Sequence, residues 1–210
     1  AGWSFMGRRS LHTADELREL IVQASTDLIH ESGLVGLSAR EIARRIDYSP
    51  GTLYNSFDNL DDLILTIEGR LLDRLSEELD TVPGDCELHE RVYRTADCYL
   101  KFAGGNPRLW NLLFEHHVPV SQTLPDWYRQ KLDVLASTFE RVLQPLSKGL
   151  SEDEARRSAR VLWSSVHGIS SLAVADKLSI VSAEEAPILM RNLVGTYLAG
   201  LEARCAQAAG

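Results

Sequence analysis

Residues 32–63, SGLVGLSAREIARRIDYSPGTLYNSFDNLDDL, decide the fold of this chain. Ser38 and Glu41 have the spacing of a capping box, which predicts the start of a short helix over residues 38–46. Asp47-Tyr48 then forms a tight turn into a second short helix. Two short helices joined in this way are a helix-turn-helix unit, whose second helix usually lies in the major groove of DNA.

The second helix of this unit also has a defined start. Ser49 is a natural N-cap, and Pro50 suits the first helical position, where its missing N–H costs no hydrogen bond. The pattern predicts that this recognition helix runs from Ser49 to about Phe57. Asp58 is placed to cap the next helix, which extends to about Val82.

The whole chain reads as helical, with no strand pattern and no internal repeat. We therefore predict an all-α fold of about nine helices. Capping boxes at Thr13/Glu16, Ser151/Glu154 and Ser182/Glu185 support three of the helix starts. The expected helices span residues 13–33, 38–46, 49–57, 58–82, 86–103, 106–117, 124–147, 151–178 and 182 onward. The expected organisation is an N-terminal arm (1–12), a helix-turn-helix domain (13–60) and a larger helical domain (61–210), with the 58–82 helix bridging the two domains.

Composition is that of a globular protein in a reducing compartment. The chain has 210 residues, of which 44% are apolar and 25% charged, and no apolar run approaches the roughly 20 residues of a membrane span. Its three cysteines are odd in number and widely spaced, which argues against a disulfide framework. We expect a cytoplasmic protein that does not enter the membrane. Met6 is a candidate for the natural start, with residues 1–5 an addition.

The charge is unusual for a nucleic-acid-binding domain. The chain carries −8 overall, and residues 1–64 hold six basic and ten acidic residues, a net charge of −4. The basic residues are concentrated in an N-terminal arm (Arg8, Arg9) and on the 38–46 helix (Arg40, Arg44, Arg45). We therefore expect weak non-specific DNA binding and a specific mode that tolerates little salt.

The helix-turn-helix stretch resembles the tetracycline-repressor (TetR) family of bacterial regulators. The residues that carry this resemblance are Leu37-Ser38, Glu41-Ile42-Ala43, Ser49-Pro50-Gly51-Thr52-Leu53-Tyr54, Phe57 and Leu63. A second, shorter likeness lies at Trp163-Ser-Ser-Val-His167-Gly168, which is similar to the W-x-x-x-H-G signature of one TetR subgroup. The resemblance implies a ligand-binding and dimerisation domain behind the DNA-binding domain.

Eight residues are candidates for DNA contact. Thr52 and Asn55 are suited to base edges, since Asn bonds adenine bidentately and Thr meets the thymine methyl. Gly51 allows close approach of the backbone, and the resemblance implies that Tyr54 touches a phosphate. The full set is Ser38, Arg40, Ser49, Gly51, Thr52, Tyr54, Asn55 and Ser56. The competing interpretation is that these residues only cap and solvate helices.

Two positions depart from the family pattern. The family often has Lys two residues after Asp58, where this chain has Leu60, and His or Tyr before Phe57, where this chain has Ser56. Both departures remove contacts to the DNA backbone. They predict modest affinity or an unusual operator.

Large aromatic residues in the C-terminal domain predict an apolar ligand pocket with polar anchors. Trp110 and Phe114 share a helix face at spacing i, i+4, as do Trp163 and His167. The candidate ligand-binding residues are Trp110, Asn111, Phe114, His117, Trp127, Trp163 and His167. The alternative is that each is an ordinary core residue.

The last two long helices carry rows of apolar residues. The resemblance implies that this helix pair forms a four-helix bundle with a second copy, which gives a two-fold dimer for half-sites about 34–36 Å apart. The candidate interface residues are Val161, Ser165, Leu172, Leu189, Leu193, Tyr197 and Leu201. The alternative is that these rows close the core of the monomer.

Enzymatic and metal-binding patterns are weak. Glu115-His116-His117 is tempting, but adjacent histidines on a helix point about 100° apart and do not readily share one metal. We expect no cofactor, no metal and no catalytic residue. The sequence therefore predicts a homodimeric transcriptional repressor that a small molecule releases from a palindromic double-stranded operator. The alternative is a helical small-molecule or protein-binding dimer with a degenerate DNA-binding face.

Overall fold

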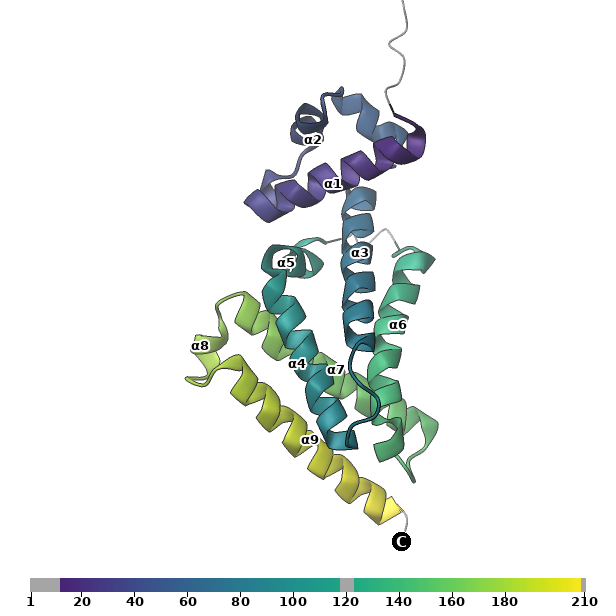
Figure 1. Ribbon diagram of the computed structural model, residues 1–210, viewed down its shortest axis with the longest axis vertical. Coiled ribbons are helices and arrows are strands. Elements are labelled where there is room, and N and C mark those ends of the chain that lie inside the picture. Colours follow the sequence, from purple (N-terminus) through teal and green to yellow (C-terminus); the bar gives the residue numbers. More distant parts are fainter. Residues whose placement is uncertain (1–11, 118–122, 209–210) are drawn as a thin grey trace, which may run out of the picture. The chain divides into compact units, whose positions relative to one another are not determined.

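The computed structural model describes residues 12–117 and 123–208 of the chain. Regular structure in these two ranges consists only of helices, which confirms the predicted all-α class (Figure 1). The α-helices are α1 (Ala14–Ser32), α2 (Ala39–Ile46), α3 (Leu60–Asp80), α4 (Leu88–Gly105), α5 (Pro107–Glu115), α6 (Asp126–Leu143), α7 (Glu152–Val174), α8 (Leu178–Val181) and α9 (Ala186–Ala208). Three short 3-10 helices are η1 (Leu34–Gly36), η2 (Pro50–Asn55) and η3 (Gln144–Leu146).

The chain divides into two compact units. The first ends at Ile67 and the second begins at Glu68, so that the boundary falls inside α3. The first unit contains α1, α2 and η2, and the second contains the helices from α4 to α9. One continuous helix therefore contributes residues to both units.

The first unit is built on α1. The predicted capping box is present, because Thr13 N donates to Glu16 Oε2 (2.7 Å) and Glu16 N donates to Thr13 Oγ1 (3.2 Å). The apolar face of α1 is buried against α2, and its fully covered side chains include Ile21 and Ile29. Leu53 of η2 and Phe57 complete this small core. Burial of these side chains fixes the two parts of the helix-turn-helix on one scaffold.

The second unit is organised around α7, which packs against α4, α6 and α9. The Ser151/Glu154 capping box at its start is also confirmed, with Ser151 N donating to Glu154 Oε2 (3.1 Å). The centre of the unit is apolar. Its most deeply buried side chains include Leu135, Leu143, Leu162, Val166, Met190 and Val194.

Several predicted helix ends are wrong, and a proline explains two of them. Gly104 and Gly105 belong to α4, which ends at Gly105. Asn106 (φ −131°) is its C-cap, because the residue before Pro107 is pushed out of the helical region. Likewise α6 ends before Pro145, whose missing N–H breaks the helical ladder, and continues only as η3.

The end of α7 and the start of α9 also differ from the prediction. Asp176 adopts a left-handed conformation (φ 55°), so α7 stops at Val174 and α8 forms separately. Ser182 does not cap the last helix, since its hydroxyl accepts from Glu184 N (3.0 Å) and α9 begins at Ala186. The described residues contain nine α-helices, the number predicted, but they are not the same nine. The predicted recognition helix is a 3-10 helix, and α8 is an additional α-helix that the sequence did not predict.

Candidate nucleic-acid interface and aromatic cluster

The helix-turn-helix begins with a capped α2. Ser38 Oγ accepts a hydrogen bond from Glu41 N at 3.2 Å, as predicted. The reciprocal half of the capping box is missing, because the Glu41 carboxylate pairs with Arg44 on the next turn. A bidentate, charge-assisted contact to a guanidinium outcompetes a single contact to a neutral N–H.

The turn after α2 has a defined geometry. Asp47 is in the left-handed region (φ 58°, ψ 44°), which Asp tolerates better than most residues. Tyr48 N donates to Ala43 O (3.0 Å), which closes the turn. The Tyr48 hydroxyl lies 2.7 Å from His12 Nδ1, which connects the segment before α1 to the turn.

The segment predicted as the recognition helix is the 3-10 helix η2. Its hydrogen bonds close over three residues, as in Ser56 N to Leu53 O (3.0 Å). Ser49 is not a side-chain cap, because its hydroxyl lies 2.9 Å from the Thr52 hydroxyl instead. A six-residue segment that contains Pro50 and Gly51 has weak α-helix propensity, and short 3-10 helices suit such segments.

The candidate DNA-contacting residues lie largely on the surface of the first unit. Tyr54 is 55% exposed. Ser38, Arg40, Ser49, Gly51 and Asn55 are also exposed, while Thr52 and Ser56 are half-buried. A Cβ added at Gly51 would meet only Ser49 Oγ, at 3.9 Å. The fold itself therefore does not require Gly51, and the space above it is open to a ligand.

The end of η2 is held by Arg18, a residue that the sequence pattern did not single out. Its guanidinium donates to the Ser56 carbonyl and lies over the Phe57 ring, 4.0 Å from the ring centroid. Arg18 Nη2 also lies 3.5 Å from Thr66 Oγ1 in α3. The Arg18 guanidinium therefore positions the end of η2 and is not directed towards a ligand. The contact joins residues 38 positions apart, which no local sequence pattern reveals.

The start of α3 is capped by Asn59. The predicted cap, Asp58, is therefore wrong. Asp62 N donates to Asn59 Oδ1 (2.9 Å), and the Asp62 carboxylate accepts from Asp58 N (3.2 Å). Leu60, where the family often has Lys, is the first residue of α3 and is half-buried. No cation stands at this position.

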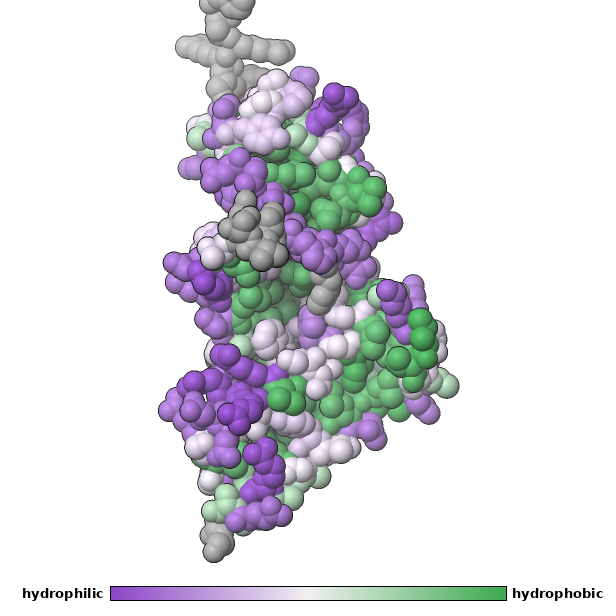
Figure 2. All heavy atoms as spheres, turned by 180° about the vertical axis from the view of Figure 1, so that it is seen from behind, coloured by the Kyte–Doolittle hydropathy of each residue, from purple (hydrophilic) through white to green (hydrophobic). Residues whose placement is uncertain are grey.

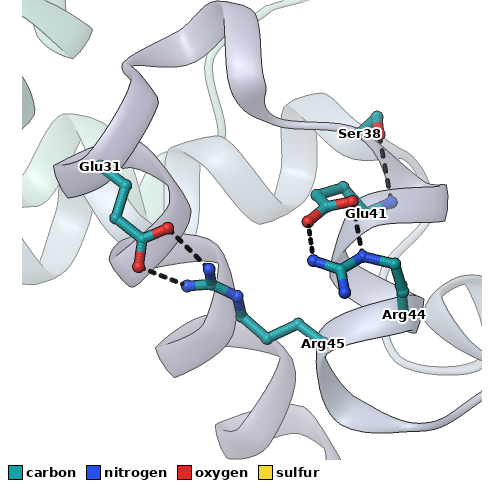
Figure 3. Close-up of polar contacts among 5 residues, drawn as sticks. All are labelled: Glu31, Ser38, Glu41, Arg44 and Arg45. Carbon is teal, nitrogen blue, oxygen red and sulfur yellow. Dashed lines mark hydrogen bonds and ion pairs between the residues drawn. The ribbon is translucent and has the colours of Figure 1, made fainter.

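The arginines of α2 differ in their partners (Figure 3). Arg44 donates twice to Glu41, and Arg45 donates twice to Glu31 of α1. These hydrogen bonds lower the pKa of both carboxyl groups. The basic cluster predicted on this helix is thus largely neutralised in the free protein, while Arg8 and Arg9 of the predicted arm lie outside the described residues.

A cluster of aromatic rings lies in the second unit around Tyr99 of α4. Trp163 Nε1 donates to the Tyr99 hydroxyl (3.2 Å), and that hydroxyl lies 2.7 Å from His167 Nδ1. Trp110 packs edge-on against Tyr99, with ring centroids 5.3 Å apart, and donates to Ser171 Oγ (3.2 Å). Three of the candidate ligand-binding residues therefore meet through Tyr99.

The other candidates lie elsewhere. Trp127, in α6, is 37% exposed and covers Gly69 of α3, where an added Cβ would come within 2.8 Å of its Cζ3 atom. His117 is exposed and Asn111 is half-buried. The side chain of Phe114 lies outside the part of the chain that the structure describes. The predicted set is therefore spread over more than one place in this unit.

The pKa of His167 predicts how stability responds to acid. Burial lowers this pKa to about 4, and the neutral ring accepts a hydrogen bond from the Tyr99 hydroxyl. Because the unfolded chain binds a proton near pH 6.5, stability present above that pH is lost as the pH falls towards 4. We expect urea unfolding midpoints to fall between pH 7 and pH 5, with a total loss of at most about 3 kcal/mol over the window. His167→Gln should flatten this dependence, and an unchanged pH slope in the variant would contradict the assignment.

A buried carboxylate is the second polar feature of this unit. Glu68 of α3 contacts His116 Nδ1 (3.0 Å) through Oε1, while the Tyr128 hydroxyl donates to Oε2 (2.9 Å). The side chains of Glu68 and His116 are only 4% and 5% exposed. Burial and the adjacent carboxylate raise the pKa of Tyr128, so that its hydroxyl stays a donor. The sequence gives no sign of this group, because its members come from α3, from the residue after α5 and from α6.

The candidate dimer residues lie on α7 and α9. Leu201 is buried in the core of its own chain, whereas Val161 is 49% exposed. Ser165, Leu172, Leu189, Leu193 and Tyr197 are half-buried. An apolar groove of about 550 Å³ on this face is lined in part by Ile169, Leu189, Leu193 and Tyr197. Figure 2 shows further hydrophobic surface at the α8 end, where Ile180, Val181 and Ile188 are exposed.

The described residues offer neither a metal-binding cluster nor a membrane-spanning helix. These residues contain no group of three or more His, Cys, Asp or Glu side chains that could hold a metal ion. No helix among them has the length and apolarity that crossing a bilayer requires. His116 is turned to Glu68 and His117 to the Glu115 carbonyl, so the two rings do not share a ligand.

A helix-turn-helix DNA-binding regulator is defined by a capped helix, a tight turn and an exposed segment such as η2, followed in the chain by a larger helical unit. The family model described as "Bacterial regulatory proteins, tetR family" matches residues 21–67. The model described as "Tetracyclin repressor-like, C-terminal domain" matches residues 92–195. The chain belongs to the tetR family, and is therefore a transcription regulator and not an enzyme. The finer W-x-x-x-H-G assignment remains a prediction.

Comparison with individual proteins gives the same family and fold. An uncharacterized HTH-type transcriptional regulator, Rv0681 of Mycobacterium tuberculosis, is 24% identical over 187 residues, which cover 89% of this chain and 82% of that protein. A transcriptional regulator from Rhodococcus sp. Rha1 has a similar structure (TM-score 0.67, 22% identity, 88% and 97% of the two chains). BioQ, solved with its double-stranded DNA operator, gives a TM-score of 0.62 at 18% identity over 92% of this chain and 99% of that one. These likenesses to solved structures establish the shared fold.

Proposed function

We propose that this regulator is a ligand-responsive repressor that binds a palindromic operator and leaves it when a small molecule binds the second unit. The observation that carries the proposal is the exposed η2, which presents Gly51, Tyr54 and Asn55 to solvent on a capped scaffold. Residues 13–60 would form the DNA-binding domain and residues 61–210 the ligand-binding and dimerisation domain. A cytoplasmic location follows from the role.

The DNA contacts divide into two kinds. Thr52 and Asn55 are suited to base edges in the major groove, and Tyr54, Ser38 and Arg40 to phosphates. BioQ, which has the same fold, was crystallised with a double-stranded operator. Ser49 and Ser56 would contribute from the two ends of η2.

The effector would bind in the second unit, near the aromatic cluster. Trp163, His167 and Trp110 surround Tyr99, so apolar rings lie next to hydrogen-bonding groups, which is the usual chemistry of small-molecule sites. Because α3 belongs to both units, a ligand that favours one arrangement of this helix would shift the equilibrium away from the DNA-binding state. The effector's differential affinity for the two states sets the size of that shift.

The dimer would form through α7 and α9. Val161 and the apolar groove beside Leu189 and Leu193 leave hydrophobic surface uncovered on this face. A second copy related by a two-fold axis would cover the same surface on both chains. Such a dimer places two reading elements on two half-sites, which is why a palindrome is expected.

The proposal is tested by selection from a random duplex-DNA library at low salt, followed by sequencing of the retained duplexes. We expect enrichment of a palindrome by the wild-type protein and a loss of at least about tenfold in affinity for Tyr54→Ala, because a phosphate contact is removed. Circular dichroism and sedimentation should show that the variant keeps its fold and its dimer, since Tyr54 is exposed.

A second candidate function is a helical small-molecule or protein-binding dimer whose DNA-binding face is degenerate. It is favoured by the neutralised arginines of α2 and by Leu60 at the start of α3. A folded dimer that enriches no duplex would select this alternative over the repressor.

A further inference from the structure

The three arginines of α2 differ in whether a carboxylate binds their guanidinium group. Arg40 is exposed and forms no hydrogen bond or ion pair with the residues that the structure describes. Arg44 donates to both oxygens of Glu41, at 3.0 Å from Nε and 2.6 Å from Nη2. Arg45 donates to both oxygens of Glu31, at 2.9 Å and 2.6 Å (Figure 3).

The two ion pairs differ in their place in the fold. The Arg45–Glu31 pair joins the last turn of α2 to the last turn of α1, and the Arg45 side chain is only 28% exposed. The Arg44–Glu41 pair lies within a single helix, at spacing i, i+3, and the Arg44 side chain is 69% exposed. The first pair therefore holds two helices together, whereas the second contributes little to tertiary structure.

The position of Arg44 makes it available to DNA. In a helix-turn-helix the first helix crosses the phosphate backbone, and here that helix is α2. Arg40 and Arg44 are four residues apart, so they lie on the same face of α2. A guanidinium binds a phosphate with the same two-pronged geometry that it uses for a carboxylate. The Glu41 carboxylate thus occupies the N–H groups that a phosphate would need.

We propose that Glu41 limits the DNA affinity of this protein by competing with phosphate for the Arg44 guanidinium. This inference rests on the proposed DNA-binding function and adds a residue that tunes it. Arg40 is then the cation of α2 that is available to bind a DNA phosphate in the free protein. Arg44 becomes available only when its hydrogen bonds to Glu41 break. Weak binding away from the operator follows from the same arrangement, because non-specific binding depends on phosphate contacts.

The test measures how the affinity for a mixed-sequence 30-base-pair duplex depends on salt, by fluorescence anisotropy of the full chain. Glu41→Gln keeps the shape of the side chain but removes the charge that holds Arg44. We expect roughly three- to tenfold tighter binding at 50 mM salt, and a plot of log affinity against log salt that is steeper by about 0.9, the value for one more phosphate contact. The double variant Glu41→Gln/Arg44→Gln should return to the wild-type slope.

Glu31→Gln is the matched control, because it makes the same chemical change in the other bidentate pair. It should lower the urea midpoint, since the tie between α1 and α2 is lost, and leave the salt slope unchanged. An equally steep slope in Glu31→Gln would show an effect of net charge alone and overturn the specific role of Glu41. An unchanged slope in Glu41→Gln, with a wild type that binds, would overturn this inference only. Absence of binding by both proteins at every salt concentration would overturn the proposed function as well.

Discussion

Replacing Glu68 with alanine is expected to lower the free energy of unfolding of the second unit by about 3–5 kcal/mol. The carboxylate is buried and serves both His116 and the Tyr128 hydroxyl. Its removal leaves two buried polar groups without the acceptor they share, and buried groups lose more than exposed ones when a partner is deleted. Urea denaturation followed by far-ultraviolet circular dichroism measures the change.

Asp73→Ala is the control for this experiment. Asp73 also lies on α3 and also pairs with a cation, since Lys131 Nζ is 2.6 Å from its carboxylate oxygens. That pair is much more open to solvent, with side chains 48% and 29% exposed, and should contribute only about 0–1 kcal/mol. Equal losses of unfolding free energy in the two variants would show that the burial of Glu68 does not increase its contribution to stability.

Trp110→Ala should cost about 3–5 kcal/mol of unfolding free energy, the second large effect. The Trp110 side chain is fully buried, packs edge-on against Tyr99 and donates its indole N–H to Ser171. Deleting it opens a cavity at the centre of the aromatic cluster, and the surrounding helices relax only in part.

The matched control is Trp127→Ala, which deletes the same atoms at a site that is 37% exposed. Its loss should be well under half of the Trp110 value, because much of the Trp127 ring already contacts water. A similar midpoint for the two variants in urea would refute the assignment of Trp110 to the core. Fluorescence is unsuitable as the readout here, since both variants remove an emitting residue.

The features that sequence predicted well are those set by neighbouring residues. The capping boxes of Thr13 and Ser151 each involve a partner three residues away, so the pattern contains the whole interaction. Prediction failed where a stronger partner intervened. Glu41 has the correct spacing from Ser38 but turns to Arg44, and Asn59 displaces Asp58 as the cap of α3.

The interior of the second unit was harder to foresee. Tyr99 joins Trp163 and His167 from 64 and 68 positions away, and the sequence of α4 gives no sign of that role. Composition alone groups Trp127 with the other aromatic residues, but in the structure it covers Gly69 on α3. Such assignments depend on which helix faces pack together, and helical periodicity alone does not settle that.

The 3-10 geometry of η2 has a consequence for the spacing of bases in an operator. In a helix with three residues per turn, side chains at i and i+3 stand in straight columns, about 6 Å apart along the axis. Leu53 occupies the column turned to the core, which leaves two outward columns, Gly51 with Tyr54 and Thr52 with Asn55. Base pairs follow one another at about 3.4 Å, so the members of one column lie nearly two steps apart. In the proposed DNA complex, with η2 lying along the groove, Thr52 and Asn55 would reach bases that have another base between them.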